Sequence, residues 1–225
     1  MVKSLNISIA FGGGLLRSHD RTLKHWIKLK NQLIDLGHSV SFHGHYWDFC
    51  KLDKNWLPHL TSVEATSDSD IEDWASIDVV QRTHDARLET AVYHYGQHFS
   101  GLFALHQVND ADLVLRARWD SQPAYQNLYL LQHLTKYNSP YAFTENVFNR
   151  GNLKTHDVSF MFNRAALGQI KKNSPYDLIT LVSKKFYMDR NTPVNLSAHD
   201  LWDDIMRINK IKRVNVAPIS AKIIR

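Results

Sequence analysis

The sequence contains one cysteine, Cys50, among 225 residues. A single thiol excludes a disulfide within the chain and any zinc or iron–sulfur site built from several cysteines. We interpret Cys50 as a reduced, half-buried side chain. Long apolar runs are also missing: none approaches the ~20 residues that a membrane-spanning helix needs, and the N-terminal run is too short for a signal peptide. We therefore expect no transmembrane segment and a location in the cytoplasm.

Unusual composition is absent as well. Hydrophobic residues make up 44% of the chain, charged residues 22% and aromatic residues 11%, which excludes a disordered, collagen-like or fibrous protein. At roughly 100 to 200 residues per domain, the length favours a single domain spanning residues 1–225. The sequence contains no internal repeat and no linker, and nothing in it defines an oligomeric state.

Charge of one sign is missing from two segments. Residues 64–78 contain six acidic and no basic residues, whereas residues 205–225 contain six basic and no acidic residues. The formal net charge is +5. A basic segment of this kind suits a polyanion such as nucleic acid or the phosphates of a nucleotide, although a solvated surface is the usual explanation of a charge run.

The beginning of the chain predicts a β-α-β unit. Residues 5–11 are apolar and lead through a triple-glycine turn into a helical pattern, which starts near residue 20 with Ser18 or Asp20 as its cap. Residues 38–47 then alternate between apolar and polar side chains, as a strand does.

Strands and helices alternate along the rest of the chain. The expected strands are residues 112–118, 141–148, 158–162 and 213–216. The expected helices are residues 85–108, 122–137, 163–172, 177–186 and 198–209. This alternation predicts an α/β fold, a single domain with a mostly parallel, Rossmann-like sheet flanked by helices and with ligands at the carboxyl ends of its strands.

A glycine turn provides the first candidate site. Gly12, Gly13 and Gly14 lie where a strand passes into a helix, and backbone amides at such a place can hold a phosphate. The pattern lacks the last glycine of a dinucleotide fingerprint, and no Gly-Lys-Ser/Thr follows, so neither a dehydrogenase nor a P-loop enzyme is indicated. A tight turn explains the glycines equally well. Arg17 adds a guanidinium that can donate a fork of hydrogen bonds to a diphosphate.

The strand at residues 112–118 provides the second candidate site. Arg116 and Arg118 lie two residues apart and so share a face that suits anions. Asp120 follows the strand and can provide one oxygen ligand for a divalent cation that bridges a diphosphate. The structural alternative is an internal salt bridge between arginine and aspartate.

Histidines and isolated carboxylates complete the candidates. His43 with His45, and His94 with His98, fall on one face of a strand or helix, but neither pair has a third ligand at a recognisable spacing, which disfavours a hydrolytic zinc site. Asp157, just before an apolar strand, is a candidate general base, and His199, at the start of a helix, is a candidate ligand or diphosphate contact. These are predictions from residue type and position.

Together, these motifs resemble a family of small nucleotide-sugar-dependent glycosyltransferases of GT-A type, found in large viruses, bacteriophages and bacterial polysaccharide clusters. Each motif is loose by itself, and the resemblance depends on their order along nearly the whole chain. The matching pieces are Gly14-Leu-Leu-Arg17, Phe42-His43-Gly-His45-Tyr-Trp47-Asp48, Asp112 to Asp120, Asp157 before Val158 to Phe162, Asn209-Lys-Ile211 and Ile224-Arg225.

The resemblance implies a nucleotide sugar, such as a UDP-sugar, as co-substrate. It implies that the loop with Gly14 and Arg17, together with Arg116 and Arg118, binds the donor diphosphate. It further implies a nucleotide-binding half at residues 1–120 and an acceptor half at residues 121–225. We expect Asp157, with His199 as second choice, to deprotonate the acceptor hydroxyl.

One departure from the family pattern concerns the metal. The resemblance implies that Asp120 stands at the metal-binding position, for Mg²⁺ or Mn²⁺. The family's Asp-x-Asp is here Arg118-Trp119-Asp120, so a cation replaces one carboxylate. The need for a metal is therefore open, because Arg118 can supply charge that a metal supplies elsewhere.

The basic composition favours a hydroxylated or hydroxymethylated base in phage DNA as the acceptor. Double-stranded DNA would then be bound by Lys210, Lys212 and Arg213, in the cytoplasm of the host cell if a phage encodes the chain. Transfer to a surface glycan or lipopolysaccharide is the alternative within enzymes. An inert nucleic-acid-binding module is the alternative from another class. The sequence specifies neither the sugar nor the stereochemical course.

Overall fold

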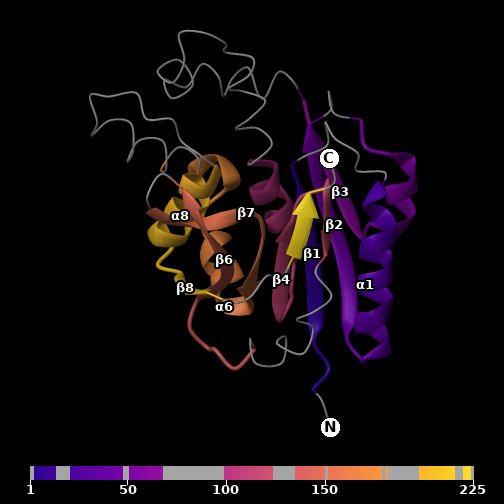
Figure 1. The fold of residues 1–225 in the computed structure, drawn as a ribbon, viewed down its shortest axis with the longest axis horizontal. Helices are drawn as coiled ribbons and strands as arrows, with labels where there is room; N and C mark the ends of the chain where they lie inside the picture. Colours follow the sequence, from indigo (N-terminus) through magenta and orange to yellow (C-terminus); the bar gives the residue numbers. More distant parts are fainter. Residues whose placement is uncertain are drawn as a thin grey trace.

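The computed structural model describes residues 3–13, 21–47, 51–67, 99–123, 135–149, 152–178, 181, 198–215 and 220–223. For residues 145–149, 152–159, 198–201, 215 and 220–223 it describes the backbone. These parts form one seven-stranded sheet covered by helices on both faces, together with a small two-stranded sheet (Figure 1).

The strands of the main sheet follow the order β3-β2-β1-β4-β7-β6-β8. Their bounds are β1 (Asn6–Gly12), β2 (Ser39–Trp47), β3 (Ser62–Thr66), β4 (Leu113–Ala117), β6 (Tyr141–Asn149), β7 (Asn152–Asn163) and β8 (Lys212–Asn215). Every neighbouring pair is parallel except those of β7, which runs antiparallel to β4 and β6. The predicted α/β fold with a mostly parallel sheet is confirmed.

The reversal of β7 has a local cause. Only residues 150 and 151 separate β6 from β7, and a parallel connection needs a crossover of a dozen or more residues. The two strands therefore form a hairpin. The sequence predicted both strands but not their antiparallel pairing.

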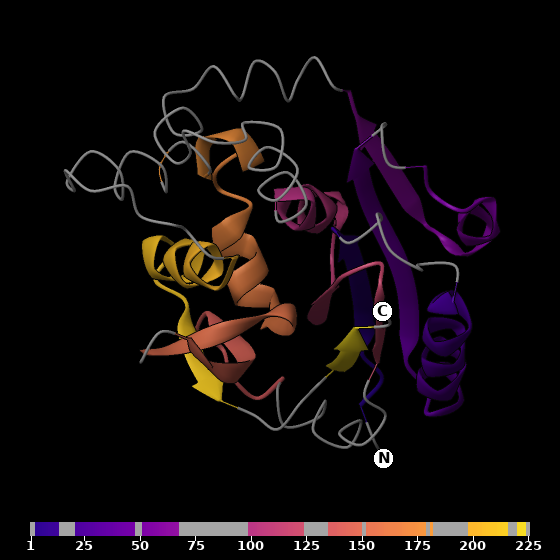
Figure 2. The ribbon, with the colours of Figure 1, turned by 45° about the horizontal axis from the view of Figure 1, so that its top comes forward.

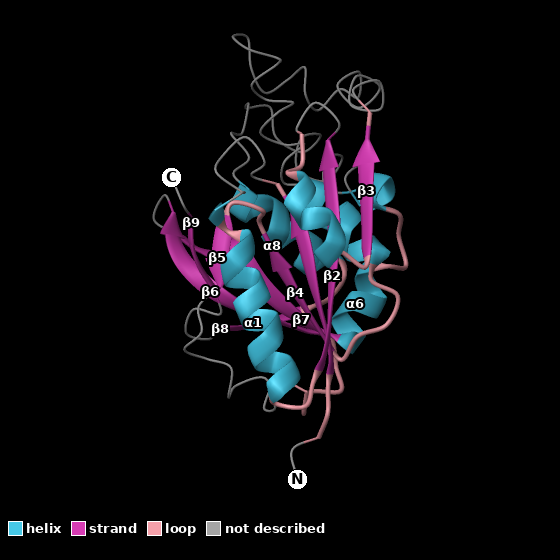
Figure 3. Cartoon of the chain, turned by 90° about the vertical axis from the view of Figure 1, so that its right-hand side faces the viewer, coloured by secondary structure: helices cyan, strands magenta, loops and turns pink. Residues whose placement is uncertain are grey.

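Helices cover the two faces of the sheet unequally. The helix α1 (Leu23–Asp35) and the 3-10 helix η2 (Lys54–His59) pack on one face. The helical segment 99–107, α6 (Arg164–Ile170) and α8 (Ala198–Ile208) pack on the other. Figures 1 and 3 show α1 on one side of the strands, with α6 and α8 on the other. No helix among the described residues is long and apolar enough to span a membrane.

The opening β-α-β unit is confirmed by the parallel pairing of β1 with β2. In α1, the buried face consists of Leu23, Trp26, Leu29 and Leu33, at the spacing of three and four residues that predicts a helix. The residue before the helix is Thr22, not Ser18 or Asp20. Gly37 ends the turn after α1 with φ +87°, which a residue with a side chain rarely adopts.

Three short elements differ from the sequence prediction. The strand β3 and the helix η2 lie between residues 48 and 66, where the sequence predicted no helix or strand. Residues 121–123 form the strand β5, so the helix predicted from residue 122 is wrong at its start; residues 124–134 lie outside the described residues. The strand β9 (Ser220–Ile223) pairs antiparallel with β5 (Figure 2). This pairing brings the end of the chain to the residues that directly follow β4.

A tryptophan after β4 fills one of the two cores. The ring of Trp119 is fully buried, stacks on Phe11 at 5.2 Å between centroids and meets Trp56 edge-on at 4.9 Å. Gly44 makes room for it, because a Cβ at this position would lie 2.4 Å from the Trp119 ring. The β2 strand must therefore have a glycine at this position for Trp119 to pack.

We expect Gly44→Ala to lower the free energy of unfolding by about 1 to 3 kcal/mol, since the added methyl overpacks a rigid aromatic core. Gly168→Ala in α6 is the matched control, because nothing lies within 4 Å of a Cβ there. The control should be stabilised by about 0.5 to 1 kcal/mol, since alanine is the better helix former. Urea unfolding followed by circular dichroism measures both. Equal effects of the two substitutions would contradict the packing argument.

Candidate functional site

The carboxyl edge of the sheet brings together the two motifs that the sequence singled out. Gly12 ends β1, Gly13 follows with φ 79°, and the backbone amide of Trp119 donates to the Gly13 carbonyl at 3.1 Å. The glycine turn and the segment Arg118-Trp119-Asp120 are thus in direct contact. Gly14 and Arg17 lie outside the described residues.

Gly12 also allows a helix to approach the strand. A Cβ on Gly12 would lie 2.4 Å from the backbone nitrogen of Gly101, in the first turn of the helical segment 99–107. Strand and helix therefore meet backbone to backbone. The absence of a side chain at both Gly12 and Gly101 permits this close approach.

Arg118 and Asp120 form a buried ion pair at this edge. The Nε of Arg118 donates to Oδ1 of Asp120 at 2.9 Å, and Nη2 donates to Oδ2 at 2.9 Å. Arg118 is 8% exposed and Asp120 is 0% exposed. Two parallel hydrogen bonds between a guanidinium and a carboxylate are the strongest arrangement of such a pair. The internal salt bridge weighed in the sequence analysis is therefore present.

The backbone of the same segment is held from several sides. Thr22 Oγ1 donates to the Trp119 carbonyl at 2.6 Å, and Trp26 Nε1 donates to the Ser121 carbonyl at 2.6 Å. Ser121 Oγ donates to the Arg118 carbonyl at 2.7 Å. The sequence analysis missed these anchoring residues. The contacts of Thr22 and Trp26 span 97 and 95 positions, so no local sequence pattern indicates them.

Arg116 lies in the core rather than at the surface of the edge. It is 0% exposed, and its guanidinium lies over the rings of Trp202 and Phe160 at 5.2 and 5.5 Å. Such cation–π contacts are favourable when water is excluded. Gly101 makes this packing possible, because a Cβ there would lie 2.8 Å from the Arg116 Nε. Arg116 thus links β4 to α8 in this structure.

His45 is a buried neutral imidazole. Ser100 Oγ donates to the His45 carbonyl at 2.7 Å, so its own oxygen accepts from Nδ1–H of His45 at 3.1 Å. Nε2 then accepts from Thr66 Oγ1 at 2.6 Å. The hydrogen-bond network assigns this tautomer. Burial lowers the pKa of His45 to about 3.

His43 belongs to a second chain of hydroxyl groups on the same face. Ser62 donates to Gln107 Oε1 at 2.8 Å, so His43 Nδ1 donates to Ser62 and Nε2 accepts from Ser41. Burial, and then the positive charge of Lys171, lower the pKa of His43. Both histidines are hydrogen-bonded to hydroxyls. The described part of the chain contains no cluster of three His, Cys, Asp or Glu side chains that could hold a metal ion.

The backbone of Asp157 lies near the same edge. In the β4–β7 ladder Ala117 pairs with Ser159, so Asp157 lies two residues beyond the last pair, where β4 has ended. The β6–β7 ladder is irregular at this place: Thr144 pairs with Phe160, but Asn146 pairs with Thr155. Residues 156–159 therefore bulge out of that ladder, a feature that is frequent beside active sites.

His199 is in the first turn of α8, where the structure describes its backbone but not its side chain. Trp202, three residues later, is the ring that Arg116 covers. The roles predicted for Asp157 and His199 stay predictions.

The basic residues predicted for nucleic acid lie elsewhere. Lys212 pairs with Tyr141 at the first position of both β8 and β6, which is the amino edge of the sheet. Lys210 is exposed in the turn before it, and Arg213 Nη1 lies 2.6 Å from Asp203 Oδ1. Asp120 follows the carboxyl end of β4. These three cations and the Arg118–Asp120 pair therefore lie at opposite edges.

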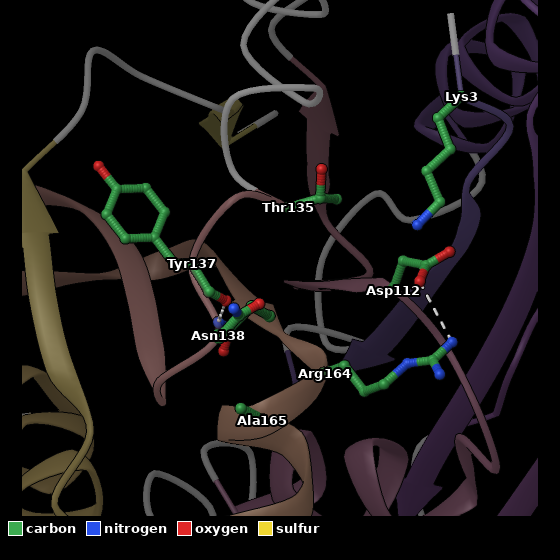
Figure 4. Close-up of a pocket in the computed structure, with 8 residues that line it drawn as sticks. Lys3, Asp112, Thr135, Tyr137, Asn138, Arg164 and Ala165 are labelled. Carbon is green, nitrogen blue, oxygen red and sulfur yellow. Dashed lines mark hydrogen bonds and ion pairs between the residues drawn. The ribbon is translucent and has the colours of Figure 1, made fainter.

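A cavity of about 320 Å³ opens at the amino edge too (Figure 4). Three of its polar lining side chains, those of Asp112, Asn163 and Arg164, are already engaged within the protein. Arg164 lies 3.1 Å from Asp112, which also accepts from the Asn6 amide. Asn163 uses both side-chain atoms: Oδ1 accepts from two backbone amides and Nδ2 donates to two backbone carbonyls. This cavity is a junction between strands and α6 rather than part of the candidate site.

No protein-family model and no curated protein matches this chain. Solved structures do match it. Mouse xyloside xylosyltransferase 1, in its apo form, is similar with a TM-score of 0.52 and 11% identity, over 95% of this chain and 85% of that one. The galactosyltransferase LgtC, in complex with donor and acceptor sugar analogs, is similar with a TM-score of 0.50 and 9% identity, over 93% and 72%. At such identities the likeness concerns the fold, which is that of GT-A glycosyltransferases.

The buried His45 predicts a stability that falls in acid. A folded-state pKa of about 3 lies below the unfolded value of ~6.5, so the unfolded chain takes up the proton first as the pH falls. The free energy of unfolding is unaffected by this titration well above pH ~6.5. It falls at lower pH, by about 2 kcal/mol at pH 5. We expect His45→Gln, although less stable at pH 8, to lose that much less between pH 8 and pH 5. Parallel pH profiles of the two proteins in urea unfolding would contradict this prediction.

Proposed function

We propose that the protein is a glycosyltransferase that moves a sugar from a nucleotide-sugar donor, such as a UDP-sugar, to a hydroxyl group of an acceptor. The observation that supports this most is the contact between the glycine turn after β1 and Arg118-Trp119-Asp120 after β4, at the carboxyl edge of a GT-A fold. Open α/β sheets bind their ligands at that edge.

The donor diphosphate requires hydrogen-bond donors and positive charge. Arg118 provides a guanidinium at this edge, next to the turn at Gly12 and Gly13. The loop continues through Gly14 to Arg17, whose guanidinium is the second candidate for the diphosphate. We propose residues 1–120 as the donor half and residues 121–225 as the acceptor half.

The transfer itself requires a base and charge stabilisation. In our proposal, Asp157 accepts the proton of the acceptor hydroxyl, whose oxygen attacks the anomeric carbon of the sugar. The bond from that carbon to the diphosphate oxygen breaks, and the nucleoside diphosphate leaves with the electron pair. Its developing charge is offset by Arg118, a fixed charge that needs no rearrangement during the reaction. His199 is the alternative base.

The position of the basic residues bears on the acceptor. A DNA base modified at the carboxyl edge would need phosphate contacts near that edge, but Lys210, Lys212 and Arg213 lie at the amino edge. A hydroxyl of a glycan or lipopolysaccharide requires no such contacts. The placement therefore favours the glycan over the hydroxymethylated base that composition favours. An inert nucleic-acid-binding module would turn over no nucleotide sugar, and Asp157 would have no catalytic role in it.

Replacing the proposed base should strongly slow sugar transfer without affecting the binding of the donor. We expect Asp157→Asn to reduce turnover about 10²- to 10⁴-fold, the usual contribution of general-base catalysis. Release of nucleoside diphosphate from a panel of UDP-, GDP- and dTDP-sugars measures turnover. Asp35→Asn, on the exposed end of α1, is the control and should retain full turnover. Unchanged turnover in Asp157→Asn together with loss in His199→Gln would assign the base to His199.

Substitution of the basic residues at the amino edge tests whether the acceptor is DNA or a glycan. We expect Lys210→Gln, Lys212→Gln and Arg213→Gln combined to leave sugar transfer unchanged. Duplex DNA binding should weaken, with a logarithmic salt slope lower by about 2.7, at ~0.9 per lost phosphate contact. Fluorescence anisotropy with labelled DNA over a salt series measures the slope. A parallel loss of DNA binding and of sugar transfer to hydroxymethylated DNA would instead make DNA the acceptor.

A further inference from the structure

The fold family commonly places a divalent cation at the position of Asp120. A metal ligand must direct a carboxylate oxygen at the ion, and hard cations such as Mg²⁺ require oxygen ligands. Both oxygens of Asp120 instead accept hydrogen bonds from Arg118, at 2.9 Å each. Among the side chains that the structure describes, those at this position do not fit a divalent cation.

We propose that Arg118 permanently takes the place of the cation, so that the edge binds a nucleoside diphosphate without metal and Asp120 acts as a positioning residue for the guanidinium. The diphosphate part of this inference rests on the proposed function. The part concerning the ion pair rests on the geometry of Arg118 and Asp120 alone.

Charge balance supports the replacement. Two carboxylates of an Asp-x-Asp pattern carry two negative charges, which a divalent cation neutralises. Here one guanidinium and one carboxylate already sum to zero within a buried pair. A divalent cation at this position would add two positive charges to a pair that has no net negative charge. Burying such unbalanced charge is strongly unfavourable.

The surrounding structure keeps the pair in place. A cation could bind only if Asp120 turned away from Arg118, and the segment that contains both is fixed at its carbonyls. Thr22 holds the carbonyl of Trp119, and Trp26 holds that of Ser121. The next residues, 121–123, form β5 and pair with β9. A carboxylate in such a frame cannot rearrange without losing several buried hydrogen bonds.

The guanidinium also has the geometry that a diphosphate needs. The fork to Asp120 uses Nε–H and one N–H of Nη2, two of the five N–H donors that the planar guanidinium presents. Arginine donates to phosphate oxygens in the same planar manner as to carboxylates. Asp120 fixes this plane next to the glycine turn, whose Gly13 carbonyl accepts from the Trp119 amide.

The test titrates Mn²⁺ into the full chain and follows free Mn²⁺ by electron paramagnetic resonance. We expect the wild-type protein to bind no stoichiometric Mn²⁺ at millimolar concentration. Arg118→Asp restores two carboxylates at the Asp-x-Asp spacing and should gain one Mn²⁺, which Arg118→Asp combined with Asp120→Asn should lose. Lys24→Asp, exposed on α1, adds the same charge elsewhere and should bind none. One equivalent of Mn²⁺ on the wild type that Asp120→Asn abolishes would overturn the proposal.

A second measurement uses UDP and GDP, titrated calorimetrically in EDTA and in Mg²⁺. We expect the nucleotide that binds more tightly to bind equally well in EDTA and in Mg²⁺. Arg118→Gln is a smaller change than Arg118→Asp and should weaken this binding about 10- to 100-fold, because it removes a charge-assisted pair of hydrogen bonds. Binding that requires Mg²⁺ would overturn the metal-free site even if Arg118→Asp fails to fold. If neither nucleotide binds in either condition and no nucleotide sugar is turned over, the proposed function is rejected. The Mn²⁺ titration would still show whether the Arg118–Asp120 pair excludes a divalent cation.

Discussion

The position of Trp119 determines the geometry of the candidate site. Its ring is buried against Phe11 and Trp56, and its indole N–H donates to the His45 carbonyl at 3.0 Å. Its own backbone contacts Gly13 and Thr22. Because the two charged residues of the site are its immediate neighbours in sequence, packing of this one ring fixes both. Burial of a large aromatic side chain thus supplies the rigidity that a preorganised charged site needs.

The same edge illustrates how charge is tolerated inside the protein. Arg118 is neutralised by Asp120, whereas Arg116 lies over the rings of Trp202 and Phe160. Uncompensated burial of either guanidinium would be strongly unfavourable. The two arginines are two residues apart and have different surroundings, because Arg116 lies in β4 and Arg118 lies beyond its end at Ala117. Strand periodicity alone would have given them equal roles.

How far the sequence predicts this structure depends on the range of the interactions. The β-α-β unit, β4 and α8 follow from local apolar patterns and are correct. The strands β3, β5 and β9 are three to five residues long and have no apolar run, so only their partners define them. The contact between Gly13 and Trp119 follows from the pairing of β1 with β4, which the sequence did not specify. The amino-edge location of Lys212 follows from the pairing of β8 with β6, which no local pattern encodes.

The candidate site depends on contacts between distant parts of the chain. The hydrogen bonds that hold its central segment join residues 97, 95 and 74 positions apart. Its last strand, β5, is completed by β9, close to the end of the chain. Contacts of such separation have a large loop-closure cost and tend to form late in folding. The ion pair between Arg118 and Asp120 is local, but its burial is not. The charged groups of the site are therefore close together in sequence, but their dry, fixed environment depends on the packing of α1, β2 and the C-terminal strand around them.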